Sequence, residues 1–396
     1  TGGTVRSSPI VADGVVYVGS SDGVMYALDA ETGSKIWSAD VGSPVGGAAL
    51  VTDAITVVLD RQNHVHALDR RDGKRVWTFR GGRDLDLPWG WEGFDYILAS
   101  PVLSGSTVIV GTGDGHVYGL DLTTGRELWR FATEGRIRSS AVIHEGVAYV
   151  GAGDGIVYGI DVRSGSEVWR YETAGATLNA EDWGFDRTQI CSSPAVVDGI
   201  LYLGSRDGSL YSLDIAKKDT VWTFTDGTSW VISSPAVTSE RVFSARSGSQ
   251  KVRALDVGSG EELWSVVTGG YVFSSPRVVG NTVYVGSGSG IVYALDGSSG
   301  ETRWSYRTDG AIFGTPTIWD GRLYVGSDDE YVYAFESTDG EQPRLAVYWD
   351  DALADKAIWG ANELHKLVAT FFQDRGYKPL DSGGLRAFMS RRVADS

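Results

Sequence analysis

The sequence is poor in cysteine, proline and positive charge, and each shortage excludes a class of protein. Its 396 residues include one cysteine, Cys191, so no disulfide can form within the chain. The 53 glycines follow no triplet period and only 10 prolines accompany them, which excludes collagen and argues against a disordered low-complexity chain. The formal net charge of −16 disfavours nucleic acid and anionic membranes as partners, because both attract basic surfaces.

Long apolar runs are missing as well. No stretch approaches the roughly 18 apolar residues that a membrane-spanning helix needs, so the sequence predicts no membrane span. It also holds no phosphate-binding glycine loop and no G-x-S-x-G turn. The many glycines instead indicate a chain with many tight turns.

An internal repeat organises most of the chain. The unit is plain in VVYVGSSDGVMYALDAETGSKIW (Val15–Trp37), and its Y-A-L-D core recurs seven more times. The last residues of the eight copies are Asp29, Asp69, Asp121, Asp161, Asp214, Asp256, Asp296 and Glu336, in steps of 40, 52, 40, 53, 42, 40 and 40 residues. A period near forty residues indicates a repeat architecture, in which each copy forms one structural unit.

Each copy predicts four short strands. An S-S-P-x-V segment such as Ser192–Val196 comes first, then a V-Y-V-G-S strand, a V-Y-A-L-D strand and a strand that carries tryptophan. Alternating β-branched and aromatic residues between Asp-Gly and Thr-Gly turns are typical of hairpins. Four strands repeated eight times predict an all-β fold, an eight-bladed β-propeller of four-stranded blades.

A tryptophan follows the turn glycine by four residues in most copies. The set is Trp37, Trp77, Trp129, Trp169, Trp264 and Trp304, with Trp222 at the same place in the copy whose turn has become AKKDT. The motif A-x-D-x-x-T-G-x-x-x-W, formed by Ala27, Asp29, Thr32, Gly33 and Trp37, resembles the tryptophan-docking motif of the pyrroloquinoline-quinone-enzyme repeat family over residues 1–340. The resemblance implies that these indoles pack on the neighbouring blade and are structural.

The end of the repeat predicts a change of architecture. We expect a propeller over residues 1–342 and a small α/β C-terminal extension over residues 343–396, with an amphipathic helix at Asp355–Tyr377. Copy eight has Arg344 where the spacing calls for tryptophan. Ring closure in such folds usually completes one blade from both termini, so either Pro343–Trp349 or residues preceding Thr1 supply the last strand.

The resemblance also raises a cofactor hypothesis, which the residues disfavour. Quinone dehydrogenases of this family use a vicinal cysteine pair and a calcium set of Glu, Asn and Asp, and neither is matched here. Pyrroloquinoline quinone with calcium is therefore disfavoured and no cofactor is predicted. The chain resembles more closely the non-catalytic branch, the outer-membrane assembly lipoproteins, which implies an extracytoplasmic location.

Other catalytic and metal patterns are weak. His64 and His66 form the only close histidine pair, but His66 stands at the tyrosine position of the repeat, which favours packing. The Asp-Gly turns at Asp22, Asp114, Asp154 and Asp207 fit ordinary turn chemistry better than calcium sites. No metal site is predicted.

Positions that vary between copies mark a candidate site. The residue two positions before the first serine of each S-S-P segment is apolar in every copy, which predicts a core position. Its neighbours vary, and we expect them to ring one mouth of the central channel. Cationic and aromatic members of this set suit anionic, planar or sugar groups. The candidate site residues of this set are Arg6, Tyr96, Arg136, Arg138, Gln189, Trp230 and Tyr271. The alternative is that the arginines pair with acids such as Glu134, Asp182 or Asp186.

The two long steps place similar inserts on this mouth. They are Gly81–Pro101 and Ala180–Gln189, and both contain a W-G-aromatic motif beside carboxylates. Their candidate residues are Trp89, Trp91, Trp183, Asp182 and Asp186. Either the loops bind a ligand or they pack over the mouth, since long loops in compact domains are often functional.

Three functions follow from these residues. The favoured one is a ligand- or protein-binding scaffold, with a protein partner or an anionic or carbohydrate small molecule. The alternative is a carbohydrate-active lyase or hydrolase at the same mouth, in which paired carboxylates do acid and base work. A quinone-dependent dehydrogenase ranks third.

Overall fold

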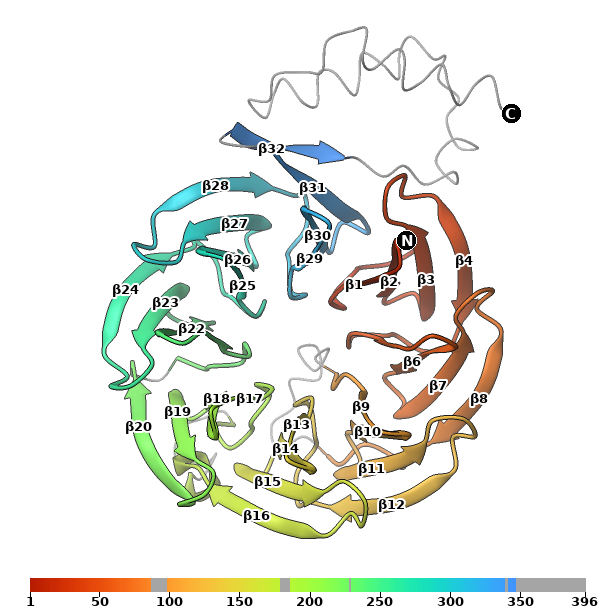
Figure 1. Cartoon of the computed structure of the whole chain (residues 1–396), viewed down its shortest axis with the longest axis horizontal. Helices are drawn as coiled ribbons and strands as arrows, with labels where there is room; N and C mark the ends of the chain where they lie inside the picture. Colours follow the sequence, from red (N-terminus) through yellow and green to blue (C-terminus); the bar gives the residue numbers. More distant parts are fainter. Residues whose placement is uncertain (87–97, 179–185, 228, 339–340, 347–396) are drawn as a thin grey trace, which may run out of the picture. The chain divides into compact units, whose positions relative to one another are not determined.

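A computed structural model describes residues 1–86, 98–178, 186–227, 229–338 and 341–346. The described residues form eight four-stranded antiparallel sheets arranged around a central channel, as Figure 1 shows. Each sheet is built from four consecutive strands, with the first strand innermost and the fourth on the outside (Figure 1). The all-β, eight-bladed propeller predicted from the repeat is confirmed.

The first four blades follow the chain in order. Blade 1 contains β1 (Ile10–Ala12), β2 (Val15–Gly19), β3 (Val24–Asp29) and β4 (Lys35–Asp40). Blade 2 contains β5 (Leu50–Val51), β6 (Ile55–Leu59), β7 (His64–Asp69) and β8 (Arg75–Arg80). Blade 3 contains β9 (Val102–Ser104), β10 (Thr107–Gly111), β11 (His116–Asp121) and β12 (Glu127–Ala132). Blade 4 contains β13 (Val142–His144), β14 (Val147–Gly151), β15 (Ile156–Asp161) and β16 (Glu167–Glu172), followed by the 3-10 helix η2 (Ala174–Thr177).

The second four blades complete the ring. Blade 5 contains β17 (Ala195–Val197), β18 (Ile200–Gly204), β19 (Ser209–Asp214) and β20 (Asp219–Thr225). Blade 6 contains β21 (Ala236–Val237), β22 (Arg241–Arg246), β23 (Lys251–Asp256) and β24 (Glu262–Val267). Blade 7 contains β25 (Arg277–Val279), β26 (Thr282–Gly286), β27 (Ile291–Asp296) and β28 (Thr302–Arg307). Blade 8 contains β29 (Thr317–Trp319), β30 (Arg322–Gly326), β31 (Val332–Thr338) and β32 (Glu341–Ala346).

The small residue in the Y-A-L-D core is explained by strand register. In seven blades the docking tryptophan stands directly opposite it on the third strand, as Ala27 does to Trp37 and Gly119 to Trp129. A Cβ added at Gly119 would lie 2.2 Å from the indole of Trp129. A larger side chain at this position would therefore displace the tryptophan from the blade.

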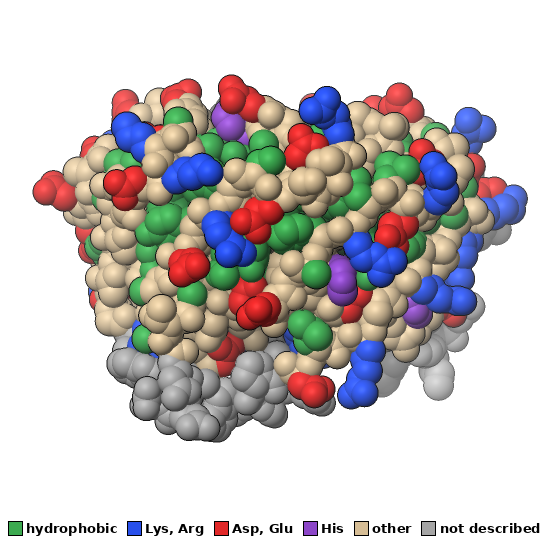
Figure 2. All heavy atoms as spheres, turned by 90° about the horizontal axis from the view of Figure 1, so that it is seen from below, with side chains coloured by type: hydrophobic (Ala, Val, Ile, Leu, Met, Phe, Trp, Pro, Cys, Tyr) green, Lys and Arg blue, Asp and Glu red, His purple; other side chains and the backbone are tan. Residues whose placement is uncertain are grey.

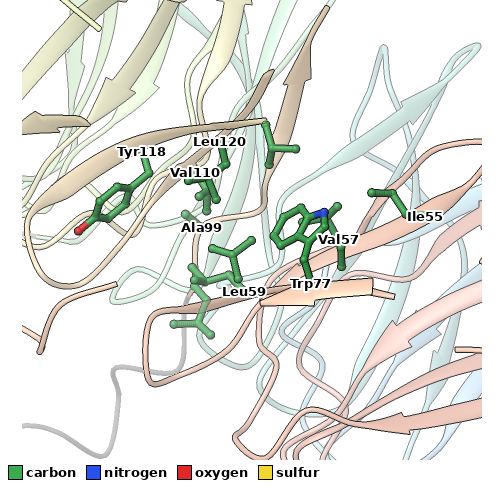
Figure 3. Packing of buried hydrophobic residues seen from close by; sticks show 12 residues of the cluster. Ile55, Val57, Leu59, Trp77, Ala99, Val110, Tyr118 and Leu120 are labelled. Atoms are coloured by element: carbon green, nitrogen blue, oxygen red, sulfur yellow. The ribbon is translucent and has the colours of Figure 1, made fainter. Parts of the chain in front are cut away.

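The docking tryptophans join neighbouring blades, as the motif implied. The indole N–H of Trp77 donates to the carbonyl oxygen of Leu122 in the next blade at 3.0 Å, and five others do the same at 2.9–3.0 Å. The ring face of Trp77 lies on the turn glycine Gly125, whose φ of +68° also favours glycine. Figure 3 shows Trp77 among the buried residues shared by blades 2 and 3.

The two serines of the S-S-P segment make different hydrogen bonds. The first binds within its own blade, where the hydroxyl of Ser7 accepts the backbone N–H of Gly19 at 2.9 Å. The second binds between blades, where the hydroxyl of Ser140 accepts the N–H of Ser100 at 2.8 Å. Six such bonds of 2.8–2.9 Å run around the channel from blade to blade. The innermost strands begin after the proline position, later than the sequence predicted.

The constant apolar residue of each of these segments is core, as expected. Its seven described members are at most 2% exposed: Val5, Val45, Ile137, Ile190, Val231, Val272 and Ile312. The remaining one, Ile97, lies outside the described residues. The glycine of the preceding blade leaves room for it, since a Cβ at Gly19 would lie 2.3 Å from Val45.

Of the two alternatives for ring closure, the last strand comes from the C-terminal side: β32 overlaps the predicted segment Pro343–Trp349, and no described blade is shared between the two ends of the chain. Blade 1 takes all four strands from the N-terminal end, and β32 pairs with β31 to complete blade 8. The register places Ala346 opposite Ala334, so Arg344 does not take the tryptophan position. The reason is that β31 continues to Thr338 and delays the turn into β32. The two blades meet through the N–H of Thr315, which donates to Ser8 Oγ at 2.9 Å.

The last features of the fold are the C-terminal end and the outer wall. Residues 347–396, which include most of the predicted α/β extension, lie outside the described part of the chain. Among described residues no helix is long and apolar enough to cross a membrane. Figure 2 shows acidic and basic side chains interspersed on the outer wall.

Candidate binding face at the channel mouth

One face of the propeller gathers the variable positions. In seven blades, within the described residues, the turn between the second and third strands is bonded to the residue that precedes the apolar core position, as in Ser21 N–H to Thr4 oxygen at 2.9 Å. The same contact recurs from Arg206 to Gln189 and from Gly288 to Tyr271. The first insert begins at Gly81 and the second ends at Gln189 on this face, which we call the channel-mouth face. The described residues that the sequence grouped by repeat position lie along this face.

The arginines of this face are held by acids. Arg6 makes a two-pronged ion pair with Asp328 of blade 8, with Nη2 to Oδ2 at 2.8 Å. Arg136 and Arg138 both reach Asp84 Oδ2, at 3.1 and 3.0 Å. These partners differ from the acids named from sequence, because Asp84 starts the insert and Asp328 comes from the far end of the chain.

Asp84 is the hub of this arrangement. Its other oxygen accepts the side-chain N–H of Asn63 at 2.7 Å, while Asn63 also accepts the backbone N–H of Gly113 at 2.9 Å. Arg136 donates to the carbonyl oxygen of Leu85 as well. Blades 2, 3 and 4 are thereby connected at the base of the first insert. Asp84 is one of the carboxylates of the first insert, and its position in the sequence carried no signal of this role.

A second acid–arginine–aromatic group lies at the other insert. Asp186 is 5% exposed and pairs with Arg206 at 3.0 Å, and the guanidinium of Arg206 lies 4.0 Å from the ring centre of Trp230. Asp186 also accepts the N–H of Thr188 at 2.9 Å. Gln189 is 9% exposed, with its side-chain oxygen 3.7 Å from the sulfur of Cys191. Arg206 is the member of this group that the sequence did not single out.

Three aromatic rings stack on the opposite part of the mouth. The ring centres of Tyr271, Phe273 and Phe313 lie 5.1–5.9 Å apart, and Tyr271 is 38% exposed. The guanidinium of Arg6 lies 4.9 Å from the centre of Phe313. Tyr271 was predicted as a site residue, whereas the two phenylalanines were treated only as variable neighbours.

The remaining predicted site residues lie outside the described part of the chain. They are Trp89, Trp91, Tyr96, Asp182 and Trp183. Their place on the inserts stays a prediction. The described candidates Arg6, Arg136, Arg138, Gln189, Asp186, Trp230 and Tyr271 belong to the three groups above.

The channel beneath the mouth is narrow. It encloses about 130 Å³, and its described lining includes Arg6, Arg138, Cys191, Ile232, Phe273 and the ring of serine hydroxyls. None of its described lining residues is acidic. Calcium prefers several carboxylate and carbonyl oxygens, so the described channel residues do not fit a calcium-bound quinone.

The turn aspartate Asp114 accepts hydrogen bonds from its own blade and, through Oδ2, from the backbone N–H of Gly82 in the first insert. Asp114 accepts the N–H of His116 at 3.1 Å and the hydroxyl of Tyr118 at 2.8 Å. Burial acts to raise the pKa of Asp114, but hydrogen bonds from Thr112 and Tyr118 hold this pKa below its ordinary value. An open groove of about 420 Å³ lies beside it, between blades 2 and 3. The contacts of Asp114 agree with ordinary turn chemistry.

Comparisons with known proteins place this geometry in context. The family described as outer membrane protein assembly factor BamB matches residues 1–89, 61–182, 175–272 and 248–363. The serine/threonine-protein kinase AfsK of Streptomyces griseus is 29% identical over 139 residues, 34% of this chain and 16% of that protein. The chain thus spans a small part of this relative.

Two solved structures share the fold. BamB from Moraxella catarrhalis matches with a TM-score of 0.72 at 23% identity, covering 84% of this chain and 96% of that one. Quinohemoprotein alcohol dehydrogenase from Comamonas testosteroni matches with a TM-score of 0.65 at 16% identity, covering 82% of this chain and 70% of that one. At these identities the likeness concerns the fold alone.

Proposed function

We propose that this chain, which belongs to the family of the outer membrane protein assembly factor BamB, is a protein-binding scaffold. Its partner docks on the channel-mouth face. In keeping with the family description, we place the partner among the proteins that assemble the outer membrane and the chain outside the cytoplasm. The proposal assigns it no cofactor.

The observation that carries the proposal is the exposed aromatic cluster. Tyr271 is 38% exposed and rests on two stacked phenylalanines, so its ring is held in place before any partner arrives. Rigid tyrosines and arginines supply much of the binding energy at protein interfaces, because little conformational freedom is lost when they are buried. Arg6 adds an anchored cation beside this cluster.

The size of the channel favours a protein over a small molecule. Pockets that bind small molecules commonly enclose about 300–1,000 Å³. The described channel encloses about 130 Å³ and its arginines are already engaged by Asp84 and Asp328. A carbohydrate-active site would in addition need a pair of carboxylates, and the described lining of the channel offers none.

The outer wall offers a weaker surface. In six blades an aliphatic residue stands before the docking tryptophan and is 42–49% exposed: Ile36, Val76, Leu128, Val168, Val221 and Leu263. Apolar residues scattered singly are ordinary on soluble proteins and mark no interface. They serve here as controls.

Site-specific photocrosslinking in the producing organism tests the proposal. A photoreactive residue replaces Tyr271 on the mouth or Val168 on the outer wall, and crosslinked proteins are identified by mass spectrometry. We expect one protein of the envelope assembly machinery at position 271 and not at position 168. In binding assays with that protein, Tyr271→Ser should weaken affinity at least ~10-fold, as loss of an interface anchor does.

Two results would overturn the proposal. One is equal crosslinking of the same proteins from positions 271 and 168. The other is an unchanged affinity of Tyr271→Ser for the identified partner, with Val168→Ser as the matched control.

A further inference from the structure

Three possible metal ligands meet on one hairpin of blade 2. Asp60 directly follows β6, and His64 and His66 lie at the start of β7. Asp60 Oδ2 lies 2.9 Å from His66 Nε2 and 3.3 Å from His64 Nδ1. One ligand atom from each residue lies within 4.8 Å of the other two.

This arrangement departs from the rest of the repeat. In five blades a tyrosine hydroxyl donates to the aspartate four residues earlier, at 2.6–2.8 Å: Tyr26–Asp22, Tyr118–Asp114, Tyr158–Asp154, Tyr211–Asp207 and Tyr333–Asp329. In blade 2 the tyrosine has become His66 and the aspartate position has become Gln62. The acid stands instead at Asp60, where blade 1 has Ser20.

A packing role explains only part of this change. The Asp60–His66 contact replaces the usual tyrosine–aspartate hydrogen bond. A packing role does not explain why a second imidazole, that of His64, faces the same carboxylate oxygen. In blade 1 the position of His64 is occupied by Val24. The sequence pattern indicated the two histidines but not the third residue, since Asp60 lies outside the H-x-H pattern.

The surroundings of the three residues prepare them as ligands. Asp60 is fully buried, and its Oδ1 accepts the backbone N–H groups of Gln62 and His64 at 2.8 and 2.9 Å. Its Oδ2 therefore faces the two imidazoles. The other nitrogen of His66 lies 3.2 Å from Thr78 Oγ1, which fixes the ring orientation as outer hydrogen-bond partners of metal-binding histidines do.

We infer that Asp60, His64 and His66 bind a divalent transition-metal ion of the Zn²⁺ type. Two imidazole nitrogens and one carboxylate oxygen are a donor set that suits such ions, with ligand bonds of about 2.0–2.2 Å. Two atoms bound to one ion at these lengths lie roughly 3–4 Å apart, close to the present separations. The side chain of His64 is 24% exposed, so water reaches the fourth coordination position there.

The ion would fix the turn that anchors the first insert. Asn63, next to His64, donates to Gly82 oxygen at 3.0 Å and to Asp84. Asp84 in turn holds Arg136 and Arg138. Metal binding thereby stiffens the connection between blade 2 and the channel-mouth face.

Calorimetric titration of the whole chain with Zn²⁺, after removal of metal by a chelator, tests the inference. We expect one ion per chain, a rise in melting temperature, and a Co²⁺ absorption spectrum typical of four-coordinate nitrogen and oxygen ligands. The triple variant Asp60→Ser, Gln62→Asp and His66→Tyr gives blade 2 the residues of blade 1. It should keep the fold and bind the ion more than ~100-fold more weakly, beyond the loss that outer partners cause.

Two further variants keep the test decisive if the triple variant misfolds. His64→Val removes one ligand and leaves the Asp60–His66 hydrogen bond, and should also weaken binding. His116→Val removes the corresponding histidine of blade 3, whose Nδ1 lies 3.4 Å from Asp114, and should leave binding unchanged. Binding that His64→Val leaves intact, or no stoichiometric binding by the parent chain, would overturn the inference.

Discussion

At the scale of single residues, the fold depends on close contacts between indoles and glycines of neighbouring blades. Gly125 illustrates this dependence, because it combines a φ of +68° with a Cβ position only 2.5 Å from Trp77. Its conformation therefore disfavours a side chain, and its contact with the indole leaves no space for one. Lys218 occupies the equivalent turn position of blade 5 with a φ of +56°, so the backbone requirement alone tolerates another residue.

This distinction can be measured by replacing two glycines. Gly125→Ala should lower the free energy of unfolding by about 1–2 kcal/mol for the left-handed backbone and about 1–3 kcal/mol for the clash with Trp77. Gly105→Ala is the matched control, since Gly105 has a φ of +59° and open space around its Cβ, and should show the first cost alone. Equal losses in denaturant unfolding would show that the indole contact contributes nothing.

At the scale of elements, the turn between the third and fourth strands is held by an aspartate. The backbone N–H and hydroxyl of Ser164 donate to Asp161, and they lower the pKa of this carboxyl. The same direction of shift is found at Asp29, Asp121, Asp214, Asp256 and Asp296. Each of these six turns is therefore stabilised by an ionised carboxylate.

Acid should weaken these turns. A carboxyl whose pKa is lower in the folded state contributes stability above its unfolded pKa, near pH 4, and loses it as the pH falls through the folded value. Asp161→Asn should be less stable than the parent at pH 7, and this difference should shrink toward pH 2. Thermal unfolding at both pH values measures it, and a difference independent of pH would contradict the role of the charge.

At the scale of the whole propeller, one junction differs from the other seven. Blades 8 and 1 are not consecutive in the chain, so they are held only by contacts such as Arg6 with Asp328 and Thr315 with Ser8. The indole bond that joins six of the blade pairs is replaced here by Tyr324, whose hydroxyl donates to the carbonyl oxygen of Ala30 at 3.0 Å. Opening at this junction requires no rearrangement of a connecting loop.

The destabilising effect of losing one hydrogen bond should therefore extend further from this junction than from the others. Ser8→Ala leaves the N–H of Thr315 without its acceptor, at a cost of about 1–3 kcal/mol. We expect faster amide hydrogen exchange throughout blades 1 and 8. Ser140→Ala removes the equivalent bond between blades 3 and 4 and should affect only nearby amides. The same extent of exchange in both variants would refute the special status of the junction.

The sequence by itself determined the fold, because the repeat carries it locally in every copy. Asp29, Gly33 and Trp37 already specify a turn, a backbone conformation and a blade joint, and their spacing fixes the strands between them. Repetition also separated constant core positions such as Val5 from variable ones such as Arg6. Repeat position alone led to the grouping of the candidate residues on the channel-mouth face, which stays a prediction for those outside the described part of the chain.

Only the tertiary structure decided which charges meet. Arg6 pairs with Asp328 and Arg138 with Asp84 across 322 and 54 residues of sequence, and no local pattern encodes such contacts. Asp60 likewise joins His64 and His66 because the hairpin folds its buried carboxylate toward both rings. Local periodicity specifies backbone geometry, whereas the pairing of side chains depends on how the ring closes and on where each blade places its turns.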